Sequence, residues 1–203
     1  MKRIITYIDG FNLYFGLRSK GWKRFYWLNL QQVAQRLLKP DQTLVTTKYF
    51  TAIVTHPPDK HKRQSTYIEA LSTLSDFHIF YGHYLADRLT CRNCGYVYTT
   101  YHEKMTDVNI AVELLTDAFQ DSFDVALVIS ADSDLVGPVR KVKRMFPRKR
   151  VVVVFPPGRY SNALKHTATA YTHLSRDILA RSVFPDKVVK SDGFVLSRPH
   201  QWR

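Results

Sequence analysis

The chain has 203 residues, which is enough for one domain of ordinary to large size with its own hydrophobic core. Its 30 lysine and arginine residues outnumber 17 aspartate and glutamate residues, and the formal charge of +13 suits a polyanion such as nucleic acid or an anionic membrane. The apolar runs have only the length of strands, and Asp9 interrupts the N-terminal one, so we expect neither a membrane span nor a signal peptide.

Strand-like apolar runs alternate with segments of helical periodicity along the chain. In chain order we expect a strand at 4–8, helices at 12–18 and 28–38, a strand at 44–54, a helix at 62–74, a strand at 78–85, a hairpin at 88–101, a helix at about 106–119, a strand at 125–130, a helix at 136–145, a strand at 151–155 and a helix near 163–168. This alternation favours a mostly parallel sheet covered by helices. From about residue 185 the pattern is less regular.

Two of the expected strands end on carboxylates. Asp9 follows the first strand, and Asp132 and Asp134 follow the apolar run at 125–130. Ligands of open α/β sheets bind beyond the carboxyl ends of the parallel strands. Because crowded carboxylates repel one another unless a cation or a proton relieves them, these strands predict one acidic, metal-binding cleft.

A third acid is expected at the same cleft. Asp107 lies in the first turn of the helix at 106–119 and shares a stripe with Ala111, Leu114 and Ala118, so it should face the sheet. Mg²⁺ takes oxygen ligands of this kind and keeps some of its waters. Taken singly, Asp9 and Asp107 could instead cap helices, and Asp132 could be an ordinary loop acid.

Three motifs then resemble a known family in their order and spacing. YIDGFNL at 7–13, EKMTDVNIAVELL at 103–115 and VISADSDL at 128–135 are similar to the NYN-domain proteins of the PIN-like nuclease superfamily, particularly their LabA-like bacterial branch. The resemblance covers the chain to about residue 180. It implies an α/β protein with a PIN-like three-layer α/β/α sandwich: a nuclease domain at 1–180, a cysteine-bearing β-hairpin insertion at 86–102 within it, and a C-terminal tail at 181–203.

The resemblance also implies metal-dependent ribonuclease activity and assigns roles to residues. The acids that would hold Mg²⁺ or Mn²⁺ are Asp9, Asp107 and Asp132, with Asp134 close behind. Asn12 would orient a ligand or phosphate, and Ser130 would support the cleft. Glu113 stands where the family often has Asp, and it is harder to place, because it lies about a third of a turn from the Asp107 stripe and could simply be solvated beside Asp117.

The expected reaction is hydrolysis of an RNA phosphodiester bond by an activated water, with Lys104 as a cation that could offset charge on the phosphate. Lys104 could equally be an exposed lysine at a helix start. A catalytically inactive module that binds nucleic acid or regulates, and a nuclease that cuts DNA, remain alternatives. A HAD-type phosphatase is disfavoured, because its motif needs Asp-x-Asp after the first strand and Asn12 follows Asp9 here.

The pair Cys91 and Cys94 has the spacing of one zinc knuckle within the expected hairpin. A closed zinc site needs four ligands, which His83 and His102 or a second subunit could complete; the alternative is two reduced thiols in a turn. Similar cysteine pairs occur in LabA-like relatives. Two cysteines give no disulfide framework, so we expect a reducing, cytoplasmic location.

Clustered basic residues predict salt-sensitive and sequence-tolerant binding of RNA. One cluster lies at 56–63, and the densest comprises Arg140, Lys141, Lys143, Arg144, Arg148, Lys149 and Arg150. Tyr96, Tyr98 and Tyr101 could stack on unpaired bases, which would favour single-stranded RNA, although such residues more often pack within a hairpin. A homodimer or a regulatory protein partner is compatible with the sequence.

Overall fold

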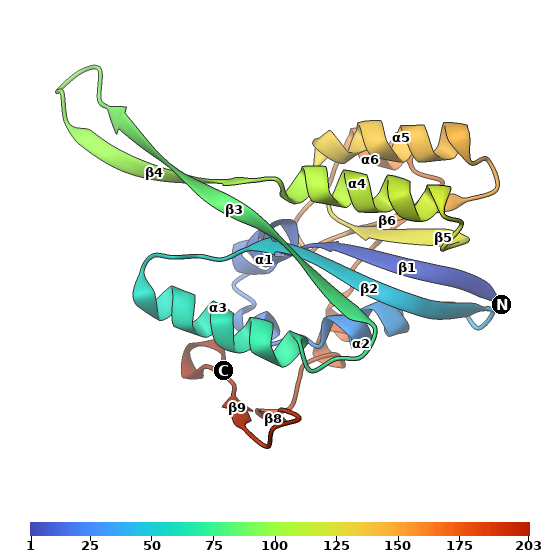
Figure 1. Cartoon of the computed structure of the whole chain (residues 1–203), viewed down its shortest axis with the longest axis horizontal. Helices are drawn as coiled ribbons and strands as arrows, with labels where there is room; N and C mark the ends of the chain where they lie inside the picture. Colours follow the sequence, from blue (N-terminus) through green and yellow to red (C-terminus); the bar gives the residue numbers. More distant parts are fainter.

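The computed structural model describes residues 1–203, except for the side chains at 86–87 and 100–103. A seven-stranded sheet of order β4-β3-β2-β1-β5-β6-β7 runs through the molecule (Figure 1). The six strands β3, β2, β1, β5, β6 and β7 are parallel to one another. The edge strand β4 is antiparallel to β3. The strands are β1 (Lys2–Asp9), β2 (Gln42–Ala52), β3 (Phe77–Thr90), β4 (Val97–Lys104), β5 (Val125–Ile129), β6 (Arg150–Phe155) and β7 (Ala170–His173).

Helices cover both faces of this sheet, so the expected α/β/α sandwich is confirmed. Figure 1 shows α4, α5 and α6 above the sheet, with α2 and α3 below it. The helices are α1 (Gly10–Ser19), α2 (Leu30–Arg36), α3 (Pro58–Leu71), α4 (Thr106–Phe119), α5 (Val136–Met145), α6 (Asn162–Thr167) and α7 (Arg176–Ala180), with short 3₁₀ turns η1 (Lys23–Tyr26), η2 (Ser133–Leu135) and η3 (His200–Trp202). No helix among the described residues is long and apolar enough to cross a bilayer.

The central strands are apolar along their length because helices bury both of their faces. All of β5 is buried, and so is β1 from Ile4 onward. Leu13, Leu71 and Leu179, from α1, α3 and α7, pack on one face of the sheet. Leu114 and Val139, from α4 and α5, pack on the other. The two layers of helices thereby hold the carboxyl ends of β1 and β5 next to each other.

The hairpin of β3 and β4 is longer than expected and projects from the body of the molecule (Figure 1). The first part of β3 pairs with β2 up to Gly82, and the second part, from His83, pairs with β4. One strand therefore belongs to the central sheet and to the hairpin, and the hairpin continues the sheet outward at its edge.

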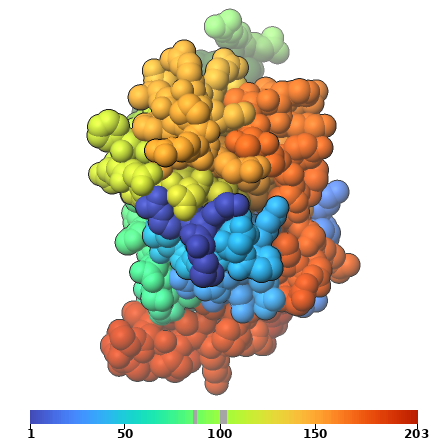
Figure 2. Space-filling view, turned by 90° about the vertical axis from the view of Figure 1, so that its right-hand side faces the viewer, coloured from blue at the N-terminus to red at the C-terminus, as the bar shows by residue number. Residues whose placement is uncertain are grey.

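The C-terminal segment packs against the main domain. Val183 pairs with Leu28 in an isolated bridge, and the indole Nε1 of Trp27 donates to the carbonyl of Pro185 at 2.8 Å. A small ribbon, β8 (Lys187–Val189) and β9 (Val195–Ser197), follows. Figure 2 shows this segment along the lower edge of the molecule. The division of the chain at residue 180 stays a prediction.

Candidate metal centre

Asp9 is the last residue of β1 and the N-terminal cap of α1. Its side chain is 4% exposed and accepts a hydrogen bond from the backbone N–H of Asn12 at 2.9 Å. Gly10 lets α1 begin this close to β2, because a Cβ atom there would lie 2.7 Å from the carbonyl oxygen of Phe50. The sequence thus folds so that the strand ends on a buried carboxylate whose direction is fixed.

A network of hydrogen bonds ties the loop after β5 to Asp9. The Ser130 hydroxyl donates to Asp9 Oδ2 at 2.7 Å and accepts from the backbone N–H of Asp132 at 3.0 Å. Asn12 Oδ1 accepts from the backbone N–H of Ala131 at 3.1 Å. Ser130 and Asn12 therefore hold the two strand ends together. The amide oxygen of Asn12 is used as the acceptor for the loop after β5.

Asp107 comes to the same place from the first turn of α4. The residue that starts this helix, Met105, has a φ of 81°, a left-handed conformation that a side chain seldom adopts. Carboxylate oxygens of Asp9, Asp107 and Asp132 all lie within 4.8 Å of one another. Asp9 is buried and the other two are half-buried, so the group faces a partly open space. Three oxygen ligands at this spacing could hold a hard divalent cation.

Asp134 lies outside this group of three, as far as the described residues go. Its side chain is exposed, and its backbone N–H donates to Asp132 Oδ1 at 3.0 Å. Asp132 therefore caps the short turn η2 while its carboxylate belongs to the acidic group. The structure brings three of the four predicted acids together and leaves the fourth beside them.

Glu113 does not lie in solvent beside Asp117. Both carboxylates contact Lys48 of β2, with Nζ distances of 2.7 Å to Glu113 and 2.6 Å to Asp117. The hydroxyl of Tyr7 donates to Asp117 at 2.6 Å, and burial together with this carboxylate raises the pKa of Tyr7 well above its ordinary value. The buried face of α4 differs from the predicted stripe. Ile110 and Leu114 are buried, and Asp107 lies at the edge of this buried face. Glu113 is the half-buried member of an ion-pair cluster that joins α4 to β2 through Lys48.

Two lysines of the predicted basic cluster have partners inside the protein. Lys143 Nζ donates to the carbonyls of Thr167 and Ala168, at 2.6 and 3.1 Å, at the end of α6. Lys149 is 8% exposed, and its Nζ bonds Asp121 and the carbonyl of Phe123. Their ammonium groups join elements of the fold, and the contact of these two lysines with RNA stays a prediction.

The remaining cluster residues are exposed, and Arg150 lies away from the acids. Arg150 pairs with Val125 at the start of β5, whereas the acids follow its last residue. Val125 and Ile129, the two ends of β5, are four residues apart, which is about 13 Å along a strand. The end of the molecule that faces the viewer in Figure 2 carries the N-terminus, in dark blue, with residues of α5 in orange above it. The exposed members are Arg140, Lys141, Arg144, Arg148 and Arg150. An RNA contact at Arg150 would be remote from the cleft.

Lys104 is exposed at the end of β4, three residues before Asp107. Among the cations predicted for the substrate it is therefore the one nearest in sequence to an acid of the centre.

Cys91 and Cys94 lie in the turn at the tip of the hairpin. Hydrogen bonds from the N–H groups of Asn93 and Cys94, and from the Cys94 thiol, lower the pKa of Cys91. His83 pairs with Lys104 at the base of the hairpin, seven strand residues from the turn, about 23 Å away. It cannot complete a zinc site in the same chain. The side chains of His102 and Tyr101 lie outside the described residues. Tyr96 and Tyr98 are exposed and stack on each other at 6.4 Å.

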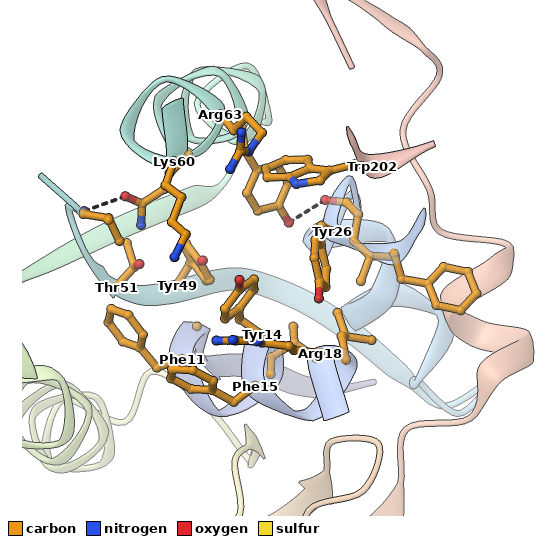
Figure 3. A pocket seen from close by; sticks show the side chains of 18 of the residues that line it. Phe11, Tyr14, Phe15, Arg18, Tyr26, Tyr49, Thr51, Lys60, Arg63 and Trp202 are labelled. Carbon is orange, nitrogen blue, oxygen red and sulfur yellow. Dashed lines mark hydrogen bonds between the residues drawn. The ribbon is translucent and has the colours of Figure 1, made fainter. Parts of the chain in front are cut away.

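A cavity of about 310 Å³ is lined by Gly10 and Phe11, the two residues that follow Asp9, and lies between α1, α3 and the end of β2 (Figure 3). Aromatic side chains provide much of its wall, among them Tyr14 and Trp202. The sequence analysis missed it. A signal was available in Phe11, Tyr14 and Phe15, which share one face of α1 at helical spacing directly after Asp9.

Comparisons with known proteins give the family and the fold of the chain. The NYN domain family model matches residues 3–175. A curated relative, "6-hydroxy-3-succinoylpyridine 3-monooxygenase HspA" of Pseudomonas putida, is 26% identical over 86% of this chain. The match spans 66% of that relative, slightly less than two thirds of its length. A crystal structure of a protein of unknown function, VPA0982 from Vibrio parahaemolyticus, matches with a TM-score of 0.54 and 17% identity, covering 87% of this chain and 94% of that one, and shares the fold.

Proposed function

Because the chain belongs to the NYN-domain family, we propose that it is a divalent-metal-dependent ribonuclease that hydrolyses RNA phosphodiester bonds at Asp9, Asp107 and Asp132. The observation that carries the proposal is the convergence of three carboxylates within 4.8 Å at the carboxyl ends of β1 and β5. Three carboxylates at this spacing repel one another unless a cation or a proton offsets their charge. An all-oxygen ligand set fits Mg²⁺ or Mn²⁺.

The three carboxylates of the centre differ in burial and in hydrogen bonding, and these differences suggest different roles. Asp9 is buried and held by the Ser130 hydroxyl and the Asn12 N–H, so it supplies a fixed anchor. Asp107 and Asp132 are half-buried and leave the open side of the group to water and phosphate. When bound, a divalent ion would supply activation of the attacking water and neutralisation of charge on the phosphate. Lys104, exposed nearby in the chain, is suited to pair with a phosphate of the strand.

The acidic cluster also separates this proposal from an inactive binding module. Clustered carboxylates repel the phosphates that such a module must attract, whereas a metal-dependent nuclease requires them. RNA is proposed in preference to DNA from the family resemblance, and a single strand because exposed aromatic side chains such as Tyr96 can stack on unpaired bases.

Oxygenation of an aromatic ring is a second candidate, because the matched Pseudomonas putida relative is named as a monooxygenase of a substituted pyridine. The aromatic cavity beside Asp9 is the observation that favours it. Consumption of 6-hydroxy-3-succinoylpyridine in the presence of oxygen and a two-electron donor would test this candidate directly.

The deciding experiment is cleavage of end-labelled single-stranded RNA and DNA with Mn²⁺, with Mg²⁺ and with EDTA. Asp132→Asn should abolish cleavage. Asp41→Asn is the matched control, since Asp41 is an exposed carboxylate that pairs with Lys2 at the opposite end of the sheet. Metal-dependent RNA cleavage that is lost only in Asp132→Asn supports the proposal. Binding without cleavage by the native protein would favour the inactive module, and equal cutting of DNA would broaden the substrate.

A further inference from the structure

The aromatic cavity begins where the acidic group ends. Gly10 and Phe11, the two residues after Asp9, line it, and Tyr49 of β2 forms part of its floor. A Cβ atom on Gly10 would lie 2.8 Å from ring carbons of Tyr49, and Tyr49 pairs across the sheet with Ile8, the residue before Asp9. The cavity therefore lies next to the end of β1 that carries Asp9, so one ligand could occupy the cavity and reach the acids.

Aromatic rings that pack on one another line the cavity. Tyr14 and Tyr26 lie with ring centroids 5.0 Å apart, and Tyr26 meets Trp202 edge to face at 5.9 Å. Phe11 contacts Tyr84 edge to face at 5.9 Å. Figure 3 shows these walls coming from α1 below and from the C-terminal segment at the side. Aromatic faces that are partly open to solvent are the usual platforms for unpaired bases.

The charge of the lining is uniformly positive. Arg18, Lys60 and Arg63 line the cavity, and its lining includes no Asp or Glu. Arg63 pairs with Asp59 on α3, at 2.7 Å. Within the described part of the chain, Arg18 and Lys60 make no ion pair. Lys60 extends from α3 toward Tyr49 in Figure 3. A ligand that suits this cavity has a planar ring and a negative charge.

The wall that carries Lys60 is fixed in place. Gln64, one helical turn further along α3, accepts from the N–H of Val54 at 2.7 Å and donates to the carbonyl of Ala52 at 2.9 Å. This pair of bonds clamps α3 to the end of β2, so the cavity is held open by polar contacts in its rim. A preformed site of this size is typical of small planar ligands.

From the aromatic walls, the positive lining and the position beside Asp9, we propose that the cavity binds one unpaired nucleotide of the RNA strand. Its base stacks against the aromatic side chains, and its phosphate contacts Arg18 and Lys60. The next phosphodiester is then positioned at Asp9, Asp107 and Asp132. This inference rests on the proposed ribonuclease function and names its substrate as a single strand.

The test uses binding in EDTA, where no cleavage occurs. Nucleoside 5′-monophosphates and a short single-stranded RNA are titrated into the native protein, and calorimetry and tryptophan fluorescence, to which Trp202 contributes, report binding. Arg18→Gln and Tyr14→Leu change exposed side chains, so both should fold, as thermal unfolding verifies. Arg36→Gln is the matched control, an exposed arginine at the end of α2. We expect Arg18→Gln to weaken mononucleotide binding about tenfold or more, and Arg36→Gln to leave it unchanged.

Three outcomes would overturn the proposal: no mononucleotide binds, Arg18→Gln binds as the native protein does, or benzoate binds as tightly as a mononucleotide. The last would make the cavity a site for small aromatic anions. These failures are distinct from failure of the ribonuclease function. Metal-dependent cleavage without nucleotide binding in the cavity would leave the acids as a nuclease centre and remove only this inference.

Discussion

Asp132→Asn should make the metal-free protein more stable, although it should abolish cleavage. Asp132 faces two carboxylates within 4.8 Å. At that separation two unit charges repel by about 0.9 kcal/mol in water and by about 3.5 kcal/mol at an effective dielectric constant near 20. Because Asp132 is half-buried, relief of both contacts should add about 1–2 kcal/mol to the free energy of unfolding, or roughly 2–8 °C in the melting temperature.

The amide retains the structural role of this residue. Asp132 Oδ1 accepts from the N–H of Asp134, and Asn caps a helical turn as well as Asp does. Asp132→Ala would also remove the repulsion but would lose the cap, so its free energy of unfolding should be about 1 kcal/mol lower than that of Asp132→Asn. Thermal unfolding in EDTA measures both variants. A clear loss of stability in Asp132→Asn would refute the repulsion argument and make Asp132 a structural acceptor.

With Mn²⁺ bound, the native protein should become more stable than Asp132→Asn, the reverse of their order in EDTA. Mn²⁺ at about 100 times its dissociation constant should stabilise the native protein by about 2.7 kcal/mol, and Asp132→Asn should lose most of this effect. Asp41→Asn, whose carboxylate lies at the opposite end of the sheet, should respond to Mn²⁺ as the native protein does. Equal stabilisation of all three proteins would place the ion elsewhere.

Three further changes test contacts that hold the fold. Lys48→Met should lower the free energy of unfolding by about 3–5 kcal/mol in urea, because Asp117 would stay buried without its cation; a loss below about 1 kcal/mol would mean that water reaches the pair. Gly10→Ala should cost about 1–3 kcal/mol and reduce cleavage, because its Cβ would lie 2.7 Å from a β2 carbonyl; unchanged activity would contradict the need for this close approach. Arg3 holds the pKa of Asp124 below its usual range, so the stability from this pair is present above about pH 4 and is lost as the pH falls further. Asp124→Asn should flatten that part of the pH profile, and a profile that does not change would assign the loss to other carboxylates.

The sequence predicted the elements that have a clear period, and the structure shows why others escaped. The helices α4 and α5 lie where the apolar spacing puts them. β7 and α7 are only four and five residues long, too short for a periodic pattern to show. The C-terminal segment has little apolar pattern of its own, because single residues such as Trp202 fill gaps between other side chains.

The acids were predictable and their charged neighbours were not. Asp9 and Asp132 follow apolar strands directly, so the topology of a parallel sheet is enough to bring them together. The ion pair of Lys48 with Glu113 joins residues 65 positions apart, and nothing local in the sequence marks it. For the same reason the buried ammonium of Lys149 looks, in sequence, like any surface cation.

The most direct test of the central claim compares two midpoints in one Mn²⁺ titration. In the native protein, cleavage of single-stranded RNA and stabilisation of the fold should rise at the same Mn²⁺ concentration, because one ion site at Asp9, Asp107 and Asp132 serves both. In Asp132→Asn both responses should disappear. Cleavage that persists in the variant, or that rises at a concentration unrelated to the stabilisation, would contradict the assignment of these three carboxylates as the catalytic centre.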